Sequence, residues 1–407
     1  MDDIPLPLPF LMDGAIGTAL ESLGMPDNIC PETWMIEHLE ILERVQRTFL
    51  DAGADVLCAP TGSANRPLLA AYGKEEQVAF YNRALVERTR LTAGERAKVL
   101  GVLSTTGLAL PPQGEADIES FIAVYREQVI ALGDAGVDAF LVDSIACVAE
   151  ARAAILSVRE ETDKPVFVTF SCDGDGRTKT GGDILAALII CQGMGADAFG
   201  IGSFYGDLSE LLDQILRLSS HATIPLMVCP GGDPVGSVWT PSAFAAAAPV
   251  FAEAGVRIYG GGADAPHIAA LRAAMDAIDF KRLPLPELEL DSDTLHCASE
   301  REARFISPLI DVGDGIICSP HFVEDLLASE DAPTGASKIV LQDEDDLDIF
   351  AENQYMIQEA LCLSSDNPSL LAKALRLYNG RAFYDGTGDL EPDVLLPLVK
   401  KYGLVVL

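Results

Sequence analysis

The sequence predicts an α/β protein, with a (β/α)8 barrel over residues 1–285 followed by a linker and a smaller α/β domain. Eight short apolar runs recur between residues 8 and 275, and a turn and a stretch of helical periodicity follow each run. That span is about the 250 residues expected of such a barrel. The runs are continuously apolar, which is typical of strands buried on both faces of a parallel sheet. At 407 residues the chain is also too long for one ordinary domain.

The eight runs give the predicted strands in chain order. They are PFLMDGAIG, ADVLCAPTG, KVLGVLST, DAFLVDS, VFVTFSCDG, AFGIGSF, PLMVCPGG and RIYGGGAD. Between them, segments 29–53, 119–136 and 208–220 alternate apolar and charged residues at helical spacing. These segments are therefore predicted to be amphipathic helices of the outer layer.

Composition changes after the eighth unit. The stretch KRLPLPELELDSD is rich in proline and acidic residues, which predicts a linker over residues 286–300. Residues 301–407 then hold five more apolar runs, GIICSP, KIVLQDE, EALCLSSD, RAFYDG and GLVVL. Five strands cannot close an eight-stranded barrel, so we expect either an open doubly wound sheet or a partial barrel.

Charge and composition exclude several classes of function. With 28 basic and 62 acidic residues the net charge is 28 − 62 = −34, which repels phosphate backbones and anionic lipid surfaces, so no nucleic acid or membrane partner is expected. The longest apolar stretch, 184–202, is interrupted by Gln192 and Asp197 and is unsuited to span a membrane. Nine cysteines without CxxC pairing, after an acidic start, predict reduced thiols in the cytoplasm.

In barrels of this type the active site lies at the carboxyl ends of the strands. The residues that close the apolar runs are therefore the candidates for chemistry. They are Asp13, Gly14, Cys58, Asp143, Ser144, Cys172, Asp173, Ser203, Cys229 and the glycines at 260–262.

Several motifs occur in an order that resembles a known family. They are LMDGAIGTALESLG, FLDAGADVLCAPTGSANRPLLAAYG, VTFSCDGDGRTKTGGD, GADAFGIGSFYGD and GGGADAPHI. Over residues 10 to 277 the chain resembles the homocysteine-binding barrel of the homocysteine S-methyltransferase family, above all the N-terminal module of cobalamin-dependent methionine synthases. The tail, ALCLSSDNPSLLAKALRLYNGRAFYDGTGD and LPLVKKYGLVVL, is similar to the first half of a pterin-binding barrel.

The resemblance implies a zinc ion held by three cysteine thiolates, with the homocysteine sulfur as the fourth ligand. In the family one cysteine lies at the end of the sixth strand and two follow glycines at the end of the eighth. The matching residues here are Ser203 and either Gly261 with Gly262 or Gly262 with Ala263. A hydroxyl or a hydrogen does not replace a soft thiolate, so the sequence lacks the usual zinc ligands.

Other cysteines offer an alternative. Cys58, Cys172 and Cys229 are predicted at the ends of the second, fifth and seventh strands, with Cys147 just beyond the fourth. They either form a relocated metal site or are buried and inert, as free cysteines commonly are.

The resemblance also implies a site for the amino-acid end of the substrate. Asp13 and Gly14 match the family motif, and Asp143 with Ser144 stands where the family has Glu and Thr. A carboxylate at each place pairs with an ammonium group. For Asp13 the alternative is a turn residue that binds nearby amides. His267, at the start of the last barrel helix, is interpreted as structural.

These features favour a methyltransferase that acts on homocysteine or a similar small acceptor. No cofactor is certain, and the methyl donor is expected to be strongly activated, such as a corrinoid, carried by a corrinoid protein, or a sulfonium compound. One alternative is a non-catalytic binding or accessory subunit of a methyl-transfer complex. The other is a barrel enzyme for a phosphorylated small molecule, because CPGGDP and GGGAD lie where many barrels bind phosphate.

Overall fold

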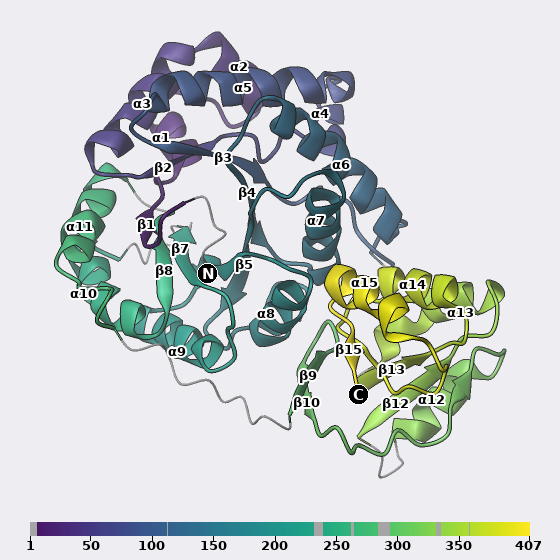
Figure 1. Cartoon of the computed structure of the whole chain (residues 1–407). Helices are drawn as coiled ribbons and strands as arrows, with labels where there is room; N and C mark the ends of the chain where they lie inside the picture. Colours follow the sequence, from purple (N-terminus) through teal and green to yellow (C-terminus); the bar gives the residue numbers. More distant parts are fainter. Residues whose placement is uncertain are drawn as a thin grey trace.

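The computed structural model describes residues 6–111, 113–231, 239–261, 264–283, 294–330, 335–357 and 359–407. Eight parallel strands form one sheet in the order β1-β8-β7-β6-β5-β4-β3-β2 (Figure 1). A bridge between Met12, just after β1, and Val56 of β2 brings the two ends of the sheet together. The predicted barrel is confirmed. Its strands are β1 (Phe10–Leu11), β2 (Val56–Ala59), β3 (Lys98–Leu103), β4 (Ala139–Ile145), β5 (Val166–Asp173), β6 (Ala198–Tyr205), β7 (Leu226–Gly231) and β8 (Val256–Tyr259).

Helices follow each strand and form the outer ring (Figure 1). Segment 29–53 forms two helices, because the backbone of His38 leaves the helical region (φ −128°, ψ 44°). Aspartates cap several helix starts, as Asp117 and Asp207 do for α6 and α9. The helices are α1 (Ile16–Ser22), α2 (Pro31–Glu37), α3 (Leu39–Asp51), α4 (Arg66–Ala70), α5 (Val78–Ala93), α6 (Ile118–Asp134), α7 (Val148–Glu161), α8 (Ile184–Gly193), α9 (Leu208–Ser219), α10 (Pro241–Glu253) and α11 (Ala265–Asp276).

Side chains fill the barrel, and the strands alternate between its interior and the helix layer. Phe10, Leu100, Leu141, Phe167 and Met227 belong to one buried cluster inside the barrel. Their strand neighbours belong to the larger cluster between the strands and the helices. This period of two decides which residues at a strand end reach the barrel mouth.

The C-terminal unit contains a second parallel sheet in the order β11-β12-β13-β14-β15. The consecutive order has no reversal point, as in a sheet of barrel type and unlike a doubly wound sheet. Its elements are β11 (Ile316–Ile317), α12 (Phe322–Glu330), β12 (Ala336–Val340), α13 (Asp345–Asn353), β13 (Ala360–Ser364), α14 (Pro368–Leu377), β14 (Phe383–Tyr384), α15 (Pro392–Tyr402) and β15 (Val405–Val406).

An antiparallel hairpin of β9 (Leu295–Ala298) and β10 (Ala303–Ile306) was not predicted. Of the linker expected over 286–300, residues 295–298 form β9, and residues 286–293 lie outside the described part of the chain. Cys297 and Ile306 of the hairpin pack on one face of the second sheet with Cys362 and Phe383. The hairpin therefore occupies surface that would otherwise be the apolar interior of a barrel.

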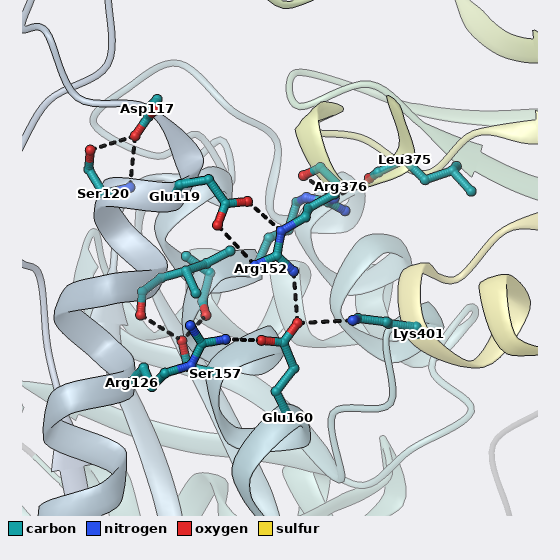
Figure 2. A network of polar contacts seen from close by, with 12 residues as sticks. Asp117, Glu119, Ser120, Arg126, Arg152, Ser157, Glu160, Leu375, Arg376 and Lys401 are labelled. Atoms are coloured by element: carbon teal, nitrogen blue, oxygen red, sulfur yellow. Dashed lines mark hydrogen bonds and ion pairs between the residues drawn. The ribbon is translucent and has the colours of Figure 1, made fainter. Parts of the chain in front are cut away.

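The C-terminal unit packs on α7 and α8 of the barrel (Figure 1). Arg152 of α7 reaches carbonyl groups at the end of α14, and Glu160 of α7 accepts hydrogen bonds from Arg376 and pairs with Lys401 (Figure 2). None of the described helices is long and apolar enough to cross a membrane.

Candidate functional site

Asp13 lies at the carboxyl end of β1, at the mouth of the barrel. Its backbone N–H donates to the carbonyl oxygen of Val56 at 3.0 Å, and its carboxylate accepts the N–H of Cys58 at 3.0 Å. Its carbonyl accepts the N–H of Gly261 at 3.0 Å. Asp13 thus joins the ends of β1, β2 and β8, and only 2% of it is exposed. Gly14, next to it, is partly buried between β1 and α1.

Asp143 and Ser144 lie near the end of β4, and β5 holds them. Thr169 donates its hydroxyl to Asp143 Oδ1 at 2.9 Å, and the same oxygen of Thr169 accepts the N–H of Ser144 at 2.8 Å. Ser144 has a φ of 54°, in the left-handed region that serine rarely adopts. Its hydroxyl donates to Asp143 Oδ1 at 3.2 Å. Non-glycine residues in this conformation are often found at functional sites.

The end of β6 completes this side of the mouth. The hydroxyl of Ser203 lies 3.1 Å from that of Ser144. Gly202 faces the same group, since a Cβ there would lie 2.4 Å from Thr169 Oγ1 and 2.6 Å from Ser144 Oγ. The site therefore requires glycine at position 202.

The two carboxyl groups share an unusual electrostatic setting. Burial raises the pKa of Asp13 to about 7, against hydrogen bonds from Cys58 that lower it, and the negative charge of Asp143 adds to the rise. Burial also raises the pKa of Asp143, against hydrogen bonds from Thr169 and Ser144. The groups that lower the pKa of Asp13 or Asp143 are hydrogen-bond donors, and none of these donors in the described part of the chain is a cation. Such a pair favours a ligand that brings its own positive charge.

The three thiols proposed for a relocated metal site do not converge. Cys58 and Cys229 lie in the barrel interior, whereas Cys172 packs in the layer between the strands and the helices. Cys172 points away because it follows Ser171, whose hydroxyl is directed to the carbonyl oxygen of Ser144. Cys147 lies at the start of α7. No group of three or more His, Cys, Asp or Glu side chains in the described ranges is placed to hold a metal ion.

The positions that match the family's zinc cysteines do not fit that metal here. Ser203 offers a hydroxyl already engaged with Ser144. Gly261 has a φ of 77°, and a Cβ there would lie 2.4 Å from the carbonyl oxygen of Cys229. Gly262 and Ala263 lie outside the described residues. A serine and a glycine are unsuited to a site built from thiolates.

The remaining sequence predictions concern the neighbouring loops. His267 uses both ring nitrogens, at 2.6 Å from Asp264 Oδ1 and 2.7 Å from the carbonyl oxygen of Trp239, which agrees with a structural role. The phosphate alternative relies on segments 232–238 and 262–263, outside the described ranges. A cavity of about 830 Å³ lies near the starts of β7 and β8, at the opposite end of the barrel from Asp13 and Asp143. We place the candidate site at the mouth because Asp13 and Asp143 lie there. Neither of them lines this cavity.

Sequence reasoning missed Thr169, Ser171 and Gly202. The signal was present in VFVTFSCD, where Thr169 and Ser171 are polar at alternate positions of an apolar strand. Alternation places both on the interior face and Cys172 on the other. Cys172, near the end of the run, was therefore a poorer candidate than the polar residues Ser171 and Thr169 that precede it.

Comparison with known proteins places the fold and the family. The family model for homocysteine S-methyltransferase matches residues 10–275. The methionine synthase of Mycobacterium leprae is 29% identical over 302 residues, which cover 68% of this chain and 25% of that protein. Homocysteine S-methyltransferase YbgG of Bacillus subtilis is 26% identical over 295 residues, covering 64% of this chain and 91% of that protein.

Solved structures agree with the fold. The metallated form of the homocysteine methyltransferase MmuM from Escherichia coli has a TM-score of 0.56 and 23% identity, covering 65% of this chain and 95% of that one. The chain spans only about a quarter of the length of the Mycobacterium leprae methionine synthase. Since the family model covers residues 10–275, the chain belongs to the homocysteine S-methyltransferase family.

Proposed function

We propose that this chain binds homocysteine or a similar small amino acid at the barrel mouth and transfers a methyl group to its sulfur. The observation that carries the proposal is the pair of carboxyl groups, Asp13 and Asp143, that lie at strand ends at the mouth and have raised pKa values. A ligand ammonium placed between them supplies the missing positive charge and favours both ionised forms. The hydroxyl of Ser203 donates to that of Ser144, which donates to Asp143 Oδ1, so the two serines hold this carboxylate in place for the ligand's ammonium group.

The transfer proceeds without zinc activation in this proposal. A thiol with a reference pKa of about 8.5 is mostly protonated at neutral pH. The sulfur–methyl bond forms as the methyl–donor bond breaks, and the thiol proton is lost to solvent. The donor therefore has to be strongly activated, as a methyl-corrinoid carried by a partner protein or a sulfonium compound is. All nine cysteines are free thiols, which supports a cytoplasmic setting.

The misfit at Ser203 and Gly261 favours a second candidate. A chain that kept the amino-acid site but not the metal site could act as a non-catalytic binding subunit of a methyl-transfer complex. The two candidates share the ligand and differ in turnover.

Calorimetric titration with L-homocysteine and L-methionine tests the shared part. We expect binding by the wild-type chain and at least about tenfold weaker binding by Asp13→Asn and Asp143→Asn, since each removes a charge-assisted hydrogen bond. Asp51→Asn, an exposed aspartate 70% accessible to solvent on α3, is the matched control and should bind as the wild type does. No binding by the wild type would reject both candidates.

Turnover separates the candidates. Incubation with L-homocysteine and either methylcobalamin or S-methylmethionine should produce methionine, at a rate that rises about tenfold per pH unit below the thiol pKa. Binding without turnover with either donor would assign the non-catalytic role.

A further inference from the structure

We propose that the hairpin turn at 299–302, in the C-terminal unit, positions the ligand site of the barrel. It does so by holding the loop between β5 and α8, residues 174–183, which in turn holds the segment that follows Asp143 and Ser144. The inference rests on the proposed function, because the site on which the turn acts is the one assigned there.

The turn touches the β5–α8 loop directly. The carbonyl oxygen of Arg301 accepts the N–H of Asp183 at 3.1 Å and a guanidinium N–H of Arg177 at 3.1 Å. Arg177 also lies 3.9 Å from the carboxylate of Glu302. A Cβ at Gly182 would lie 2.9 Å from the carbonyl oxygen of Glu300, so the two backbones are in close contact. These bonds join segments more than a hundred residues apart.

Hydrogen bonds within the loop make it a single unit. The N–H of Arg177 donates to Asp173 Oδ1 at 2.8 Å, and that of Thr178 donates to the carbonyl oxygen of Gly182 at 2.8 Å. Gly182 N–H in turn donates to Thr178 Oγ1 at 3.0 Å. A displacement at Arg177 is therefore carried along the loop.

The far side of the loop contacts the site segment. Thr180 donates its hydroxyl to the carbonyl oxygen of Ala146 at 2.6 Å. Ala146 is two residues from Ser144, whose left-handed backbone costs of order 1 kcal/mol and persists only where neighbours hold it. Thr169 and Ser171 hold it from β5. Thr180 supplies the contact from the loop side.

The turn is itself anchored in the C-terminal unit. The N–H of Ser299 donates to the carbonyl oxygen of Glu302 at 3.0 Å, and Ala298 and Arg381 exchange two backbone hydrogen bonds. Asn379 donates to the carboxylate of Glu300 at 3.3 Å. The chain of contacts thus runs from Arg381, just before β14, through the turn and the loop to Ala146, two residues from Ser144. Arg177 and Thr180 are positioning residues and do not touch the proposed ligand.

Two surface substitutions test the connection in the full chain. Arg177→Ala removes the side-chain contacts with Arg301 and Glu302 and leaves the backbone bond from Asp183 in place, and Thr180→Val removes the bond to Ala146. Each should weaken L-homocysteine binding about fivefold, and the double variant should bind no more weakly than about the worse single one, because both act through one path. Thr180→Ser, which keeps the hydroxyl, and Arg47→Ala, at an exposed position of α3, should bind as the wild type does.

Hydrogen exchange gives a readout that needs no ligand. The amides of residues 144–147 should exchange faster in Arg177→Ala and Thr180→Val than in Thr180→Ser. If the wild type binds no amino acid, the proposed function fails while the exchange data still test the contact path. Additive losses of affinity, or unchanged exchange at 144–147 together with a lower melting temperature, would overturn the inference and leave a purely structural role.

Discussion

The guanidinium of Arg152, in α7 of the barrel, donates a hydrogen bond to the carbonyl oxygen of Leu375, 2.8 Å away in the last turn of α14 (Figure 2). A second N–H reaches the carbonyl oxygen of Gly380 at 3.2 Å. Arg152 is completely buried, and burial lowers its pKa to about 10, so it remains a cation at neutral pH. The carbonyl of Leu375 lies at the C-terminus of α14, whose partial negative charge suits a cation.

Replacing Arg152 should therefore weaken the packing of the C-terminal unit on the barrel. Arg152→Met keeps apolar volume but leaves buried carbonyls unpaired, at a cost of about 3 kcal/mol. We expect a lower melting temperature by calorimetry and a broadened or split transition, because the C-terminal unit loses its contact before the barrel unfolds. Arg47→Met, at an exposed position of α3, should change stability by less than about 0.5 kcal/mol. An unaltered single transition in Arg152→Met would show that the interface does not depend on this cation.

The raised pKa of Asp13 gives a pH-dependent prediction. Its pKa is about 7 in the folded chain and about 3.9 unfolded, so between these values the folded state binds the extra proton and stability falls as pH rises. Asp13→Asn removes that penalty. The variant should have about the same melting temperature as the wild type at about pH 4 and a higher one at about pH 8. The free energy of unfolding should then differ by up to about 4 kcal/mol, at 1.36 kcal/mol per pKa unit. A constant difference across that range would contradict the shifted pKa.

Much of the fold could be predicted because parallel strands are buried on both faces and stand out as apolar runs. All eight barrel strands and the five strands of the second sheet overlap the predicted runs and extend at most two residues beyond them. The hairpin was missed because Leu295–Ala298 and Ala303–Ile306 are short, and their partners on β13 and α8 are distant in sequence. A hint lay in α8, ILAALIICQG, which has no polar face; such a helix is covered on all sides.

The candidate site was predicted in part. Strand ends indicated Asp13, Asp143, Ser144 and Ser203, and the structure places all four at the mouth. Cys172 was a poor candidate because side chains alternate along β5. The need for glycine at 202 was invisible, since it arises from Thr169 and Ser144 on two other strands. Contacts between strands follow from register, which a single sequence does not report.

Gly202 provides a steric test of the site. Gly202→Ala forces a Cβ to within 2.4 Å of Thr169 Oγ1, so Thr169 and Ser144 must shift and release Asp143. We expect a loss of about 1–3 kcal/mol in stability, as for an overpacked core, and loss of amino-acid binding in calorimetry. Gly17→Ala, at an exposed position of α1 with nothing within 4 Å of the new Cβ, is the matched control and should be neutral or stabilising. If Gly202→Ala binds the amino acid with wild-type affinity, the contacts of Thr169 are not needed for ligand binding.

His296 of β9 should make the protein sensitive to acid. Its ring lies 5.5 Å from that of His221 and 4.9 Å from that of Phe305, where the hairpin meets the barrel. Burial, with smaller contributions from the positive charges of His221 and Arg381, lowers its pKa to about 4. The unfolded chain, with a pKa of about 6.5, takes up the proton first, so stability is lost as pH falls from about 6.5 toward 4. His296→Phe removes this titration, and its melting temperature should fall less than that of the wild type between about pH 7 and pH 5.

His321→Phe, at an exposed position before α12, should follow the wild-type curve. Parallel curves for His296→Phe and the wild type would mean that the hairpin contact is not the acid-sensitive element, because no other change distinguishes the two proteins.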